Sequence, residues 1–404
     1  MAAYDVLIVG TGHAGAQAAV TLRQRGFQGT IGMLGAEPEL PYERPPLSKE
    51  YLSGDRLFDR MLLRPSAFWG ERRIDVMTGV RVAGVQAAEK VVTTTEDRCI
   101  GYGTLFWATG GAARHLACEG HDLRGVHTVR TRADVDRLIE ELSRVEHVVV
   151  VGGGFIGLEA AAVLTKLGKQ VTVLEAQDRL LARVCGEEIS RFYQHQHRSR
   201  GVDVRLNTIV SGIAGENGQA SGVILETGET ISCEMVIVGI GIVPAIEPLV
   251  VAGALEHNGV TVDHHCRTTL PDVYAMGDCA RRPSRFSDGE PIRLESIQNA
   301  GAMATTAVAS LINETLPPEQ VPWFWSNQFD LRLQTVGIAI GYDRTIIRGD
   351  ASKPGFSVIY LRHDRVIALD CVNAARDFAR GKALIAEGRA ISISALQDPS
   401  VPLV

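Results

Sequence analysis

The 404-residue chain lacks the cysteine patterns of several protein classes. Seven cysteines are an odd number, and no two of them are separated by two residues, so neither a disulfide framework nor a CxxC metal or redox site is indicated. No metal or iron–sulfur site is expected in this chain, because cluster spacing is missing. We expect small, buried apolar side chains in a reducing compartment at Cys99, Cys118, Cys185, Cys233, Cys266, Cys279 and Cys371.

Signals for export or membrane insertion are also missing. The first ten residues, MAAYDVLIVG, have no basic segment before the apolar run, which disfavours a secretory signal peptide. The longest apolar stretch, 235–255, contains Glu247, two prolines and three glycines, so it predicts a buried strand, a turn and a short helix. We therefore expect a cytoplasmic protein without a membrane partner.

Charge and composition narrow the class further. A net charge of −6 argues against a nucleic-acid partner or an anionic membrane surface for the chain as a whole. Apolar residues at 45% and charged residues at 22% are typical of soluble proteins, and the length allows two or three domains. Glycine is enriched, with 42 residues, which indicates many tight backbone turns.

A glycine motif follows the first strand signal. Residues 4–9, YDVLIV, predict a strand, and Gly10, Gly12 and Gly15 come directly before a helix. A second strand at residues 31–34 ends just before an acidic residue, Glu37. The same arrangement repeats later in the chain: a strand HVVVV at residues 147–151, then the motif glycines, a helix and a second strand that ends at an acid. Its residues are Gly152, Gly154, Gly157 and Glu175.

This pattern has a chemical reason. Glycines let a pyrophosphate reach backbone N–H groups at a helix N-terminus, and the later carboxylate accepts hydrogen bonds from ribose hydroxyls. Two copies predict two dinucleotide-binding domains of α/β type. The Glu175 carboxylate would repel a 2′-phosphate, which favours NADH over NADPH, unless Arg179 or Arg183 compensates.

The remaining strand signals lie between and after these motifs. Apolar runs at 103–110, 233–241 and 272–280 each reach a glycine at or near the end of the run. After residue 320 the composition changes to aromatic and alternating segments. This last part predicts an antiparallel sheet with a helix, DFARGKALIAEG, behind it, and hence a third domain.

Six segments together carry a family resemblance. They are PPLSK at 45–49, ATG at 108–110, GGGFIGLE at 152–159, GIGIVP at 239–244, MGDCA at 276–280 and WFWSNQF at 323–329. In this order they resemble the FAD-dependent ferredoxin reductases of bacterial oxygenase systems, which include putidaredoxin reductase-like proteins and the reductases of aromatic dioxygenases. The resemblance implies a glutathione-reductase-type α/β flavoprotein with a C-terminal α+β domain. It implies a discontinuous FAD-binding domain at 1–112 and 237–320, an NAD-binding domain at 113–236 and a C-terminal domain at 321–404.

The resemblance also assigns roles to three charged residues. Lys49 would lie near the flavin and stabilise its reduced, anionic form, Glu159 would lie near the nicotinamide and pair with Lys49, and Asp278 would hold FAD hydroxyls. Each has a simpler alternative. Lys49 could be a solvated surface lysine, Glu159 a favourable charge at a helix start, and Asp278 a helix cap.

The resemblance implies further cofactor contacts in these segments and near them. The residues are Arg44, Pro45, Ala108, Thr109, Gly110, Arg114, Ile156, Arg183, Gly239, Gly241, Gly277, Ser296 and Trp325. Aromatic packing is the alternative for Trp325. Two departures from the family pattern weaken single assignments. Ala112-Ala113 precede Arg114 where the family has proline and arginine, and Ala245 stands where asparagine is frequent.

The resemblance implies an NADH-dependent reductase. FAD would take a hydride and pass electrons singly to a [2Fe–2S] ferredoxin that supplies a cytochrome P450 or a ring-hydroxylating dioxygenase. No cysteine occurs between Leu40 and Tyr51, which argues against the disulfide reductases and cysteine-based peroxidases. An NADH:rubredoxin reductase, an NADH oxidase and a redox-sensing interaction protein remain as alternatives. Two basic clusters predict a ferredoxin-docking face or ordinary solvated surface: Arg60, Arg64, Arg72 and Arg73, and then Arg376, Arg380 and Lys382.

Overall fold

The computed structural model describes residues 3–389 and 391–403. The chain divides into two compact units, each built from separate stretches of sequence. Unit 1 contains Met1–Glu43, Phe58–Ala112 and Val243–Trp323, and unit 2 contains Arg44–Leu57, Ala113–Ile242 and Phe324–Val404. The segment 44–57, which carries PPLSK, therefore groups with the second glycine motif. The three-domain division expected from the sequence stays a prediction.

Unit 1 is built on one mixed sheet. Its strand order is β3 (Ile74–Met77), β2 (Ile31–Leu34), β1 (Ala3–Val9), β6 (Cys99–Trp107), β5 (Val91–Thr94) and β4 (Val82–Gln86), with β18 (Val273–Ala275) also paired to β6. Strands β3, β2, β1, β6 and β18 pair in parallel, whereas β4 and β5 are antiparallel. The last four residues of β1 are buried, as expected of a central strand covered on both faces.

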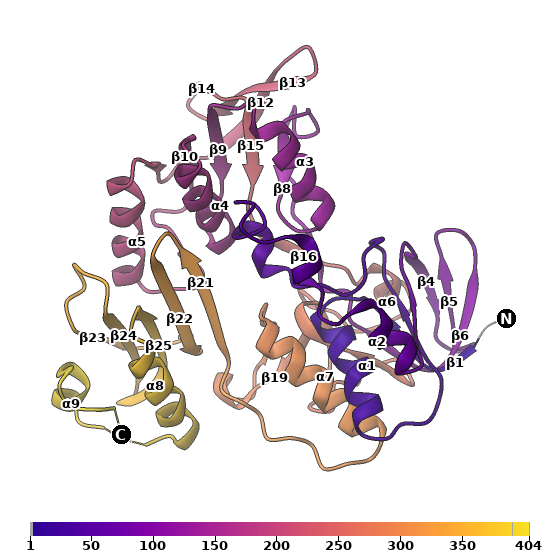
Figure 1. Ribbon diagram of the computed structural model, residues 1–404. Coiled ribbons are helices and arrows are strands. Elements are labelled where there is room, and N and C mark those ends of the chain that lie inside the picture. The colour runs from indigo at the N-terminus through magenta and orange to yellow at the C-terminus, as the bar shows by residue number, and fades with distance from the viewer. Residues whose placement is uncertain (1–2, 390, 404) are drawn as a thin grey trace. The chain divides into compact units, whose positions relative to one another are not determined.

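Small side chains let two helices of unit 1 approach each other closely. Helix α1 (His13–Gln24) packs against α7 (Ile297–Leu311), and buried alanines such as Ala18 and Ala304 belong to their shared core (Figure 1). Two shorter helices also belong to this unit: α2 (Ser66–Glu71) packs against β3, and α6 (Glu247–Val251) packs against β4.

The predicted strand, turn and short helix within residues 235–255 are confirmed by β15 (Met235–Val238) and α6.

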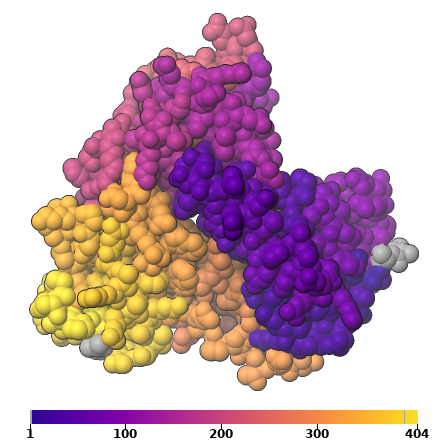
Figure 2. All heavy atoms as spheres, viewed as in Figure 1, coloured from indigo at the N-terminus to yellow at the C-terminus, as the bar shows by residue number. Residues whose placement is uncertain are grey.

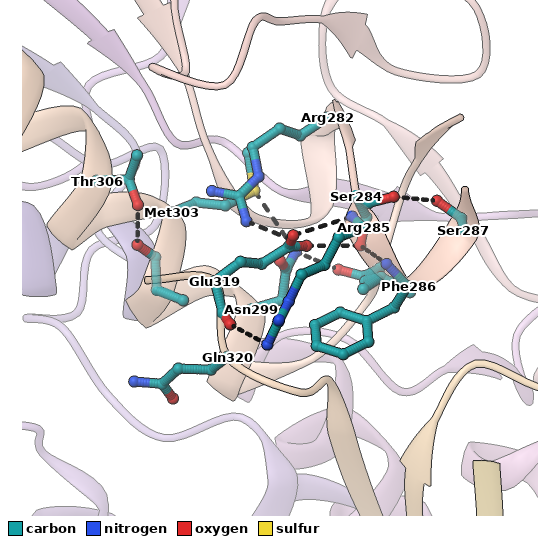
Figure 3. A network of polar contacts seen from close by, with 12 residues as sticks. Arg282, Ser284, Arg285, Phe286, Ser287, Asn299, Met303, Thr306, Glu319 and Gln320 are labelled. Atoms are coloured by element: carbon teal, nitrogen blue, oxygen red, sulfur yellow. Dashed lines mark hydrogen bonds and ion pairs between the residues drawn. The ribbon is translucent and has the colours of Figure 1, made fainter. Parts of the chain in front are cut away.

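Short elements complete unit 1. A small sheet contains β17 (Val260–Thr261), β19 (Ala280–Pro283) and β20 (Pro291–Ile292), and the 3₁₀ turns are η2 (Phe58–Met61), η3 (Gly277–Cys279) and η4 (Arg285–Ser287). Beyond α7, Glu319 anchors the irregular stretch 313–322. Its carboxylate accepts from the Ser284 hydroxyl at 2.5 Å and the Arg285 backbone N–H at 3.0 Å (Figure 3).

The second glycine motif lies in a parallel sheet of unit 2. The strand order is β11 (Asp203–Arg205), β10 (Gln170–Leu174), β9 (His147–Val151), β15 and β8 (Val126–Thr128). Helices α3 (Arg132–Leu142) and α4 (Phe155–Lys166) pack on this sheet, and α5 (Glu187–Ser199) packs on β11. An antiparallel sheet of β12 (Val210–Glu216), β13 (Gln219–Leu225) and β14 (Thr230–Ser232) follows. Two short strands, β7 (Gly111–Ala113) and β16 (Ile242–Pro244), lie where the chain passes from one unit to the other.

The C-terminal part of unit 2 forms an antiparallel sheet, as the sequence predicts. Its order is β21 (Trp323–Gln328), β22 (Leu331–Gly337), β25 (Arg365–Val372), β24 (Phe356–Arg362) and β23 (Arg344–Arg348). Helix α8 (Ala375–Glu387) packs on β25 and β22, and α9 (Ile393–Gln397) on β23. Figure 2 shows these residues gathered in one body coloured orange to yellow. The PPLSK turn is η1 (Pro45–Ser48), which packs against α3 and α4.

The cysteine prediction needs one correction. All seven thiols are free and five are buried, but Cys118 is half-buried and Cys99 is exposed at the start of β6. Cys99 is the first residue of β6, and burial in this strand begins at the next residue, Ile100. Among the described residues, no helix combines the length and apolarity needed to cross a membrane.

Candidate functional site

The first glycine loop connects β1 to α1, and each of its three glycines has a separate structural reason. Gly10 has φ of +112°, and a Cβ there would lie 2.2 Å from the Ala108 carbonyl oxygen. A Cβ at Gly15 would lie 1.9 Å from the Gly10 carbonyl oxygen, so the helix can approach the strand only with glycine. At Gly12, the N-cap of α1, no atom lies within 4 Å of a Cβ position. The helix N-terminus is therefore open to a phosphate.

The second glycine loop repeats this geometry in unit 2. Gly152 has φ of +108° and its Cβ would lie 2.5 Å from the Gly239 carbonyl oxygen. A Cβ at Gly157 would lie 2.1 Å from the Gly152 oxygen, whereas at Gly154, the N-cap of α4, the nearest atom lies 4.0 Å away. Each unit therefore contains one cradle shaped for a dinucleotide pyrophosphate.

The acidic residues beyond the second strands are both engaged. The Glu175 carboxylate accepts from the backbone N–H of Gly153 at 2.7 Å and of Gln177 at 2.8 Å, which points it back at the second glycine loop. Glu37 accepts from the Tyr42 hydroxyl at 2.5 Å. The sequence pattern selected both acids but missed Gly153 and Tyr42, because a backbone amide and a loop tyrosine carry no spacing signal.

The two arginines that could offset Glu175 differ in their surroundings. Arg179 donates to the carbonyl oxygens of Ala182 at 2.8 Å and Cys185 at 2.7 Å and to the Ser190 hydroxyl at 2.8 Å. It therefore holds the loop before α5. Arg183 is exposed, and its Nη2 lies 3.5 Å from the Cβ position of Gly241, beside the second glycine loop region.

Lys49 and Glu159 form the ion pair that the sequence predicts. The Lys49 Nζ lies 2.5 Å from Glu159 Oε2, with 11% of the lysine side chain exposed and 1% of the glutamate. The Pro45 carbonyl oxygen accepts from the same Nζ at 3.0 Å, and the Ser48 hydroxyl donates to Oε2 at 2.6 Å. Neither side chain is a solvated surface charge. A paired, hydrogen-bonded arrangement is what a buried carboxylate requires.

The other oxygen of Glu159 contacts the C-terminal sheet. Ser326 on β21 donates to Oε1 at 2.7 Å, Gln328 Nε2 lies 3.2 Å from the Ser326 hydroxyl, and His197 Nε2 lies 2.9 Å from Gln328 Oε1. Burial lowers the pKa of His197 to about 4, so the imidazole is neutral at pH 7. Sequence reasoning missed these three residues, although the WFWSNQF segment contains two of them.

The MGDCA segment meets the first glycine loop within unit 1. Gly277 has φ of +77°, and its Cβ position is 3.1 Å from Ala14 Cβ and 3.7 Å from Ala300 Cβ, so η3 lies beside the starts of α1 and α7. Asp278 is half-buried in this 3₁₀ turn. The structure thus brings this predicted residue to the N-terminus of the first dinucleotide helix.

Other predicted residues have structural contacts of their own. The Ala245 carbonyl oxygen accepts from Thr109 Oγ1 at 2.7 Å, and the Ser296 hydroxyl caps α7 by accepting from the Asn299 N–H at 3.1 Å. Arg44 donates to the Arg130 carbonyl oxygen at 2.8 Å.

Three further predicted residues lie in unit 2. The backbone N–H of Arg114 donates to the Gly241 oxygen at 2.9 Å. Trp325 packs near Phe324 at 6.1 Å between ring centroids, and Ile156 lies in the first turn of α4. Their cofactor contacts stay predictions.

Comparison with known proteins decides the family. Residues 4–304 match the model described as pyridine nucleotide-disulphide oxidoreductase, and residues 323–404 match the model described as reductase C-terminal. The chain belongs to the pyridine nucleotide-disulphide oxidoreductase family. The expected fold class, a two-dinucleotide-domain α/β flavoprotein fold with a C-terminal α+β domain, is confirmed by this match.

Two relatives and one solved structure sharpen the placement. The 5,5′-dehydrodivanillate O-demethylase ferredoxin reductase subunit of Sphingobium sp. (strain NBRC 103272 / SYK-6) is 54% identical over 99% of this chain and 97% of its own length. Putidaredoxin reductase of Pseudomonas putida is 36% identical over 99% of this chain and 96% of its own length. The solved covalent putidaredoxin reductase–putidaredoxin complex matches with a TM-score of 0.96 and 36% identity, covering 100% of this chain and 98% of that one. The predicted resemblance to ferredoxin reductases of bacterial oxygenase systems is confirmed.

Proposed function

We propose that this protein is an FAD-containing reductase that oxidises NADH and passes electrons one at a time to a [2Fe–2S] ferredoxin. The ferredoxin would supply an oxygenase, either a cytochrome P450 or a ring-hydroxylating dioxygenase. The observation that carries the proposal is the pair of glycine loops, at Gly10–Gly15 and Gly152–Gly157, which repeat one dinucleotide-binding geometry in a single chain. A chain with two such cradles is suited to transfer between two dinucleotides.

FAD fits the first cradle. Gly12 leaves the N-terminus of α1 open, Glu37 follows β2 at the position that serves a ribose, and Asp278 lies at the start of the same helix. When bound, FAD supplies a group that accepts a hydride and releases its two electrons singly. The residues of this chain bind and orient it.

NADH fits the second cradle. Glu175 is fixed by two backbone N–H groups, so a negative charge stands where the adenosine ribose of the coenzyme would lie. Arg179 donates to two carbonyl oxygens of its own loop and to the Ser190 hydroxyl on α5, and these contacts turn it away from this charge. These contacts support a preference for NADH. Arg183, which is exposed, is the remaining arginine that could weaken this preference by attracting a 2′-phosphate.

The Lys49–Glu159 pair is proposed as the electrostatic part of the site. The buried carboxylate holds the lysine ammonium through Oε2, so a positive charge is kept in a poorly hydrated place. Such a fixed cation stabilises negative charge that develops during reduction, without having to reorganise.

A ferredoxin is the acceptor that the relatives favour. The 54% identical protein of Sphingobium is named as a ferredoxin reductase subunit, while a rubredoxin–NAD⁺ reductase of Pseudomonas putida is 36% identical over 91% of this chain. Rubredoxin is therefore the second candidate acceptor.

Free cysteine thiols throughout the chain suit a reducing compartment and support a cytoplasmic location.

Flavin content and acceptor choice test this proposal. The purified protein should be yellow and release one FAD per chain on denaturation, and NADH should reduce ferredoxin faster than rubredoxin or oxygen. Fast rubredoxin turnover with slow ferredoxin turnover would favour the second candidate. Slow reduction of the flavin by NADH, with slow turnover of every acceptor, would instead favour a redox sensor. Absence of bound flavin would refute the proposal.

A further inference from the structure

The carboxylate of Glu159 is held from two sides by different parts of unit 2. Ser48 and Lys49, from the η1 turn, donate to Oε2, and Ser326, from β21, donates to Oε1. Glu159, Ser48 and Ser326 are each at most 1% exposed. An ionised carboxylate carries no proton to donate, so the Ser326 hydroxyl must be the donor.

The direction of the remaining hydrogen bonds follows from that one. Because the Ser326 hydroxyl proton is used, its oxygen accepts the Gln328 amide N–H at 3.2 Å, and the Gln328 carbonyl oxygen then accepts from His197 Nε2 at 2.9 Å. This bond places a proton on Nε2 of His197, and the pKa that burial lowers to about 4 leaves the ring neutral at pH 7. Its buried Nδ1 has no hydrogen-bond partner among the described residues, as expected of a nitrogen without a proton. All three bonds donate toward Glu159, and bonds aligned in this way polarise one another.

We propose that Ser326, oriented by Gln328 and His197, is a positioning residue that fixes the Glu159 carboxylate and thereby the direction of the Lys49 ammonium. The C-terminal sheet would then contribute to the reduction step through this hydrogen bond. The effect on reduction rests on the proposed function, whereas the effect on Lys49 does not.

The symmetry of a carboxylate explains why the Ser326 hydrogen bond would fix the direction of the Lys49 ammonium. Its two oxygens are equivalent, so without a donor at Oε1 the group can rotate and offer either oxygen to Lys49 and Ser48. The Ser326 bond removes that freedom by occupying one oxygen. A buried oxygen that loses its donor would also draw the Ser48 hydroxyl away from Oε2, because an unsatisfied buried charge is costly. The Lys49 ammonium would then be held by a carboxylate that is free to move.

The test compares two serine variants, S326A and S357A, in the full-length protein. Ser357 is a matched control, since it is also fully buried in the C-terminal sheet and donates to a carboxylate, Asp377 Oδ2, at 2.9 Å. Acetylation of Lys49 by limiting acetic anhydride, followed by mass spectrometry and normalised to exposed Lys353, reports the freedom of the Lys49 amine. S326A should raise Lys49 acetylation about tenfold, on the basis of one lost bond to a charged group, and S357A should leave it unchanged.

Kinetics and potential provide the second readout. S326A should slow flavin reduction at saturating NADH by about tenfold and shift the FAD midpoint potential, with little change in the NADH concentration for half-saturation. S326T keeps the hydroxyl, so its reduction rate and midpoint potential should be those of the parent. S326C is close in size to serine and has a weaker donor, so both quantities should lie between those of the parent and S326A. This variant also provides the test if S326A does not fold. Unchanged Lys49 acetylation in S326A or S326C would overturn the proposal. Changed acetylation in a protein whose parent form shows no flavin reduction would refute the proposed function and leave the positioning role intact.

Discussion

The Lys49 ammonium and the Glu159 carboxylate lie 2.5 Å apart, although 110 positions separate them in the chain. One comes from the turn after two prolines and the other from the first turns of the second dinucleotide helix. Their burial makes the contact more than a surface ion pair, because exposed pairs contribute little free energy. A charge held in this way is suited to an electrostatic role.

Replacing Lys49 with methionine should slow reduction of the flavin by NADH. The loss of one preorganised charge at a dry site costs about 2–4 kcal/mol, which corresponds to roughly a hundredfold in rate. FAD content should remain nearly unchanged. Stopped-flow absorbance at the flavin bands measures the rate, and Lys353→Met at an exposed lysine serves as control. A K49M rate within twofold of the parent would show that Lys49 has no such role.

Glu175→Ala should lessen the preference for NADH over NADPH. Removing the carboxylate lowers NADH affinity, because the ribose loses an acceptor, and it relieves the repulsion of a 2′-phosphate. The ratio of kcat/KM for the two coenzymes measures the change. Asp178→Ala, three residues later and exposed, should leave that ratio as it was. Equal use of both coenzymes by the unmodified enzyme would contradict the assignment.

Asp370 should make stability depend on pH. Burial raises the pKa of this carboxyl to about 7, and the Tyr360 hydroxyl donates to it at 2.6 Å. Between about pH 4 and pH 7 the folded state keeps a proton that the unfolded state releases, so the free energy of unfolding falls as pH rises. Asp370→Asn removes this dependence. The variant should gain on the order of 2–4 kcal/mol relative to the parent on going from pH 5 to pH 8.

Urea unfolding of both proteins at the two pH values checks this prediction. Asp364→Asn, at an exposed carboxylate, should behave as the parent does. If the difference in unfolding free energy between parent and D370N were the same at pH 5 and pH 8, the carboxyl would not carry a raised pKa.

Charge reversal on α8 should weaken ferredoxin reduction. Arg376 and Arg380 are exposed one turn apart, so they share one face of the helix, whereas Lys382 is half-buried. If this face steers an acidic partner, R376E and R380E should reduce the apparent association rate, and salt should reduce the rate of the parent steeply. Reduction of ferricyanide should not change. The reversal R191E on α5 is the control. Ferredoxin turnover insensitive to both salt and these reversals would place the interface elsewhere.

Local patterns in the sequence predicted much of the fold and part of the site. The glycine loops could be recognised because glycine is needed where two stretches of backbone approach closely, as at Gly15 against the Gly10 oxygen, and where a helix N-terminus is left open, as at Gly12. Glu175 could also be found from local sequence, because it directly follows the next strand, β10. The Lys49–Glu159 contact came from the family resemblance and not from spacing.

Contacts between distant segments could not be read in this way. Ser326, Gln328 and His197 reach Glu159 through side chains on β21 and α5, and no periodicity marks which buried polar group will meet which. The Ser296 hydroxyl caps α7, as a serine directly before a helix commonly does. Its expected contact with a cofactor stays a prediction.

Electron transfer from NADH through this protein to ferredoxin can be followed by absorbance in an anaerobic NADH titration with ferredoxin present. Each NADH should reduce two equivalents of the one-electron carrier, so the visible bands of ferredoxin should bleach in proportion to the NADH added, with the reductase present in catalytic amount. The same titration without the reductase should leave the ferredoxin oxidised. Oxidation of NADH with no change in the ferredoxin spectrum, or no oxidation of NADH at all, would show that the protein is not a ferredoxin reductase.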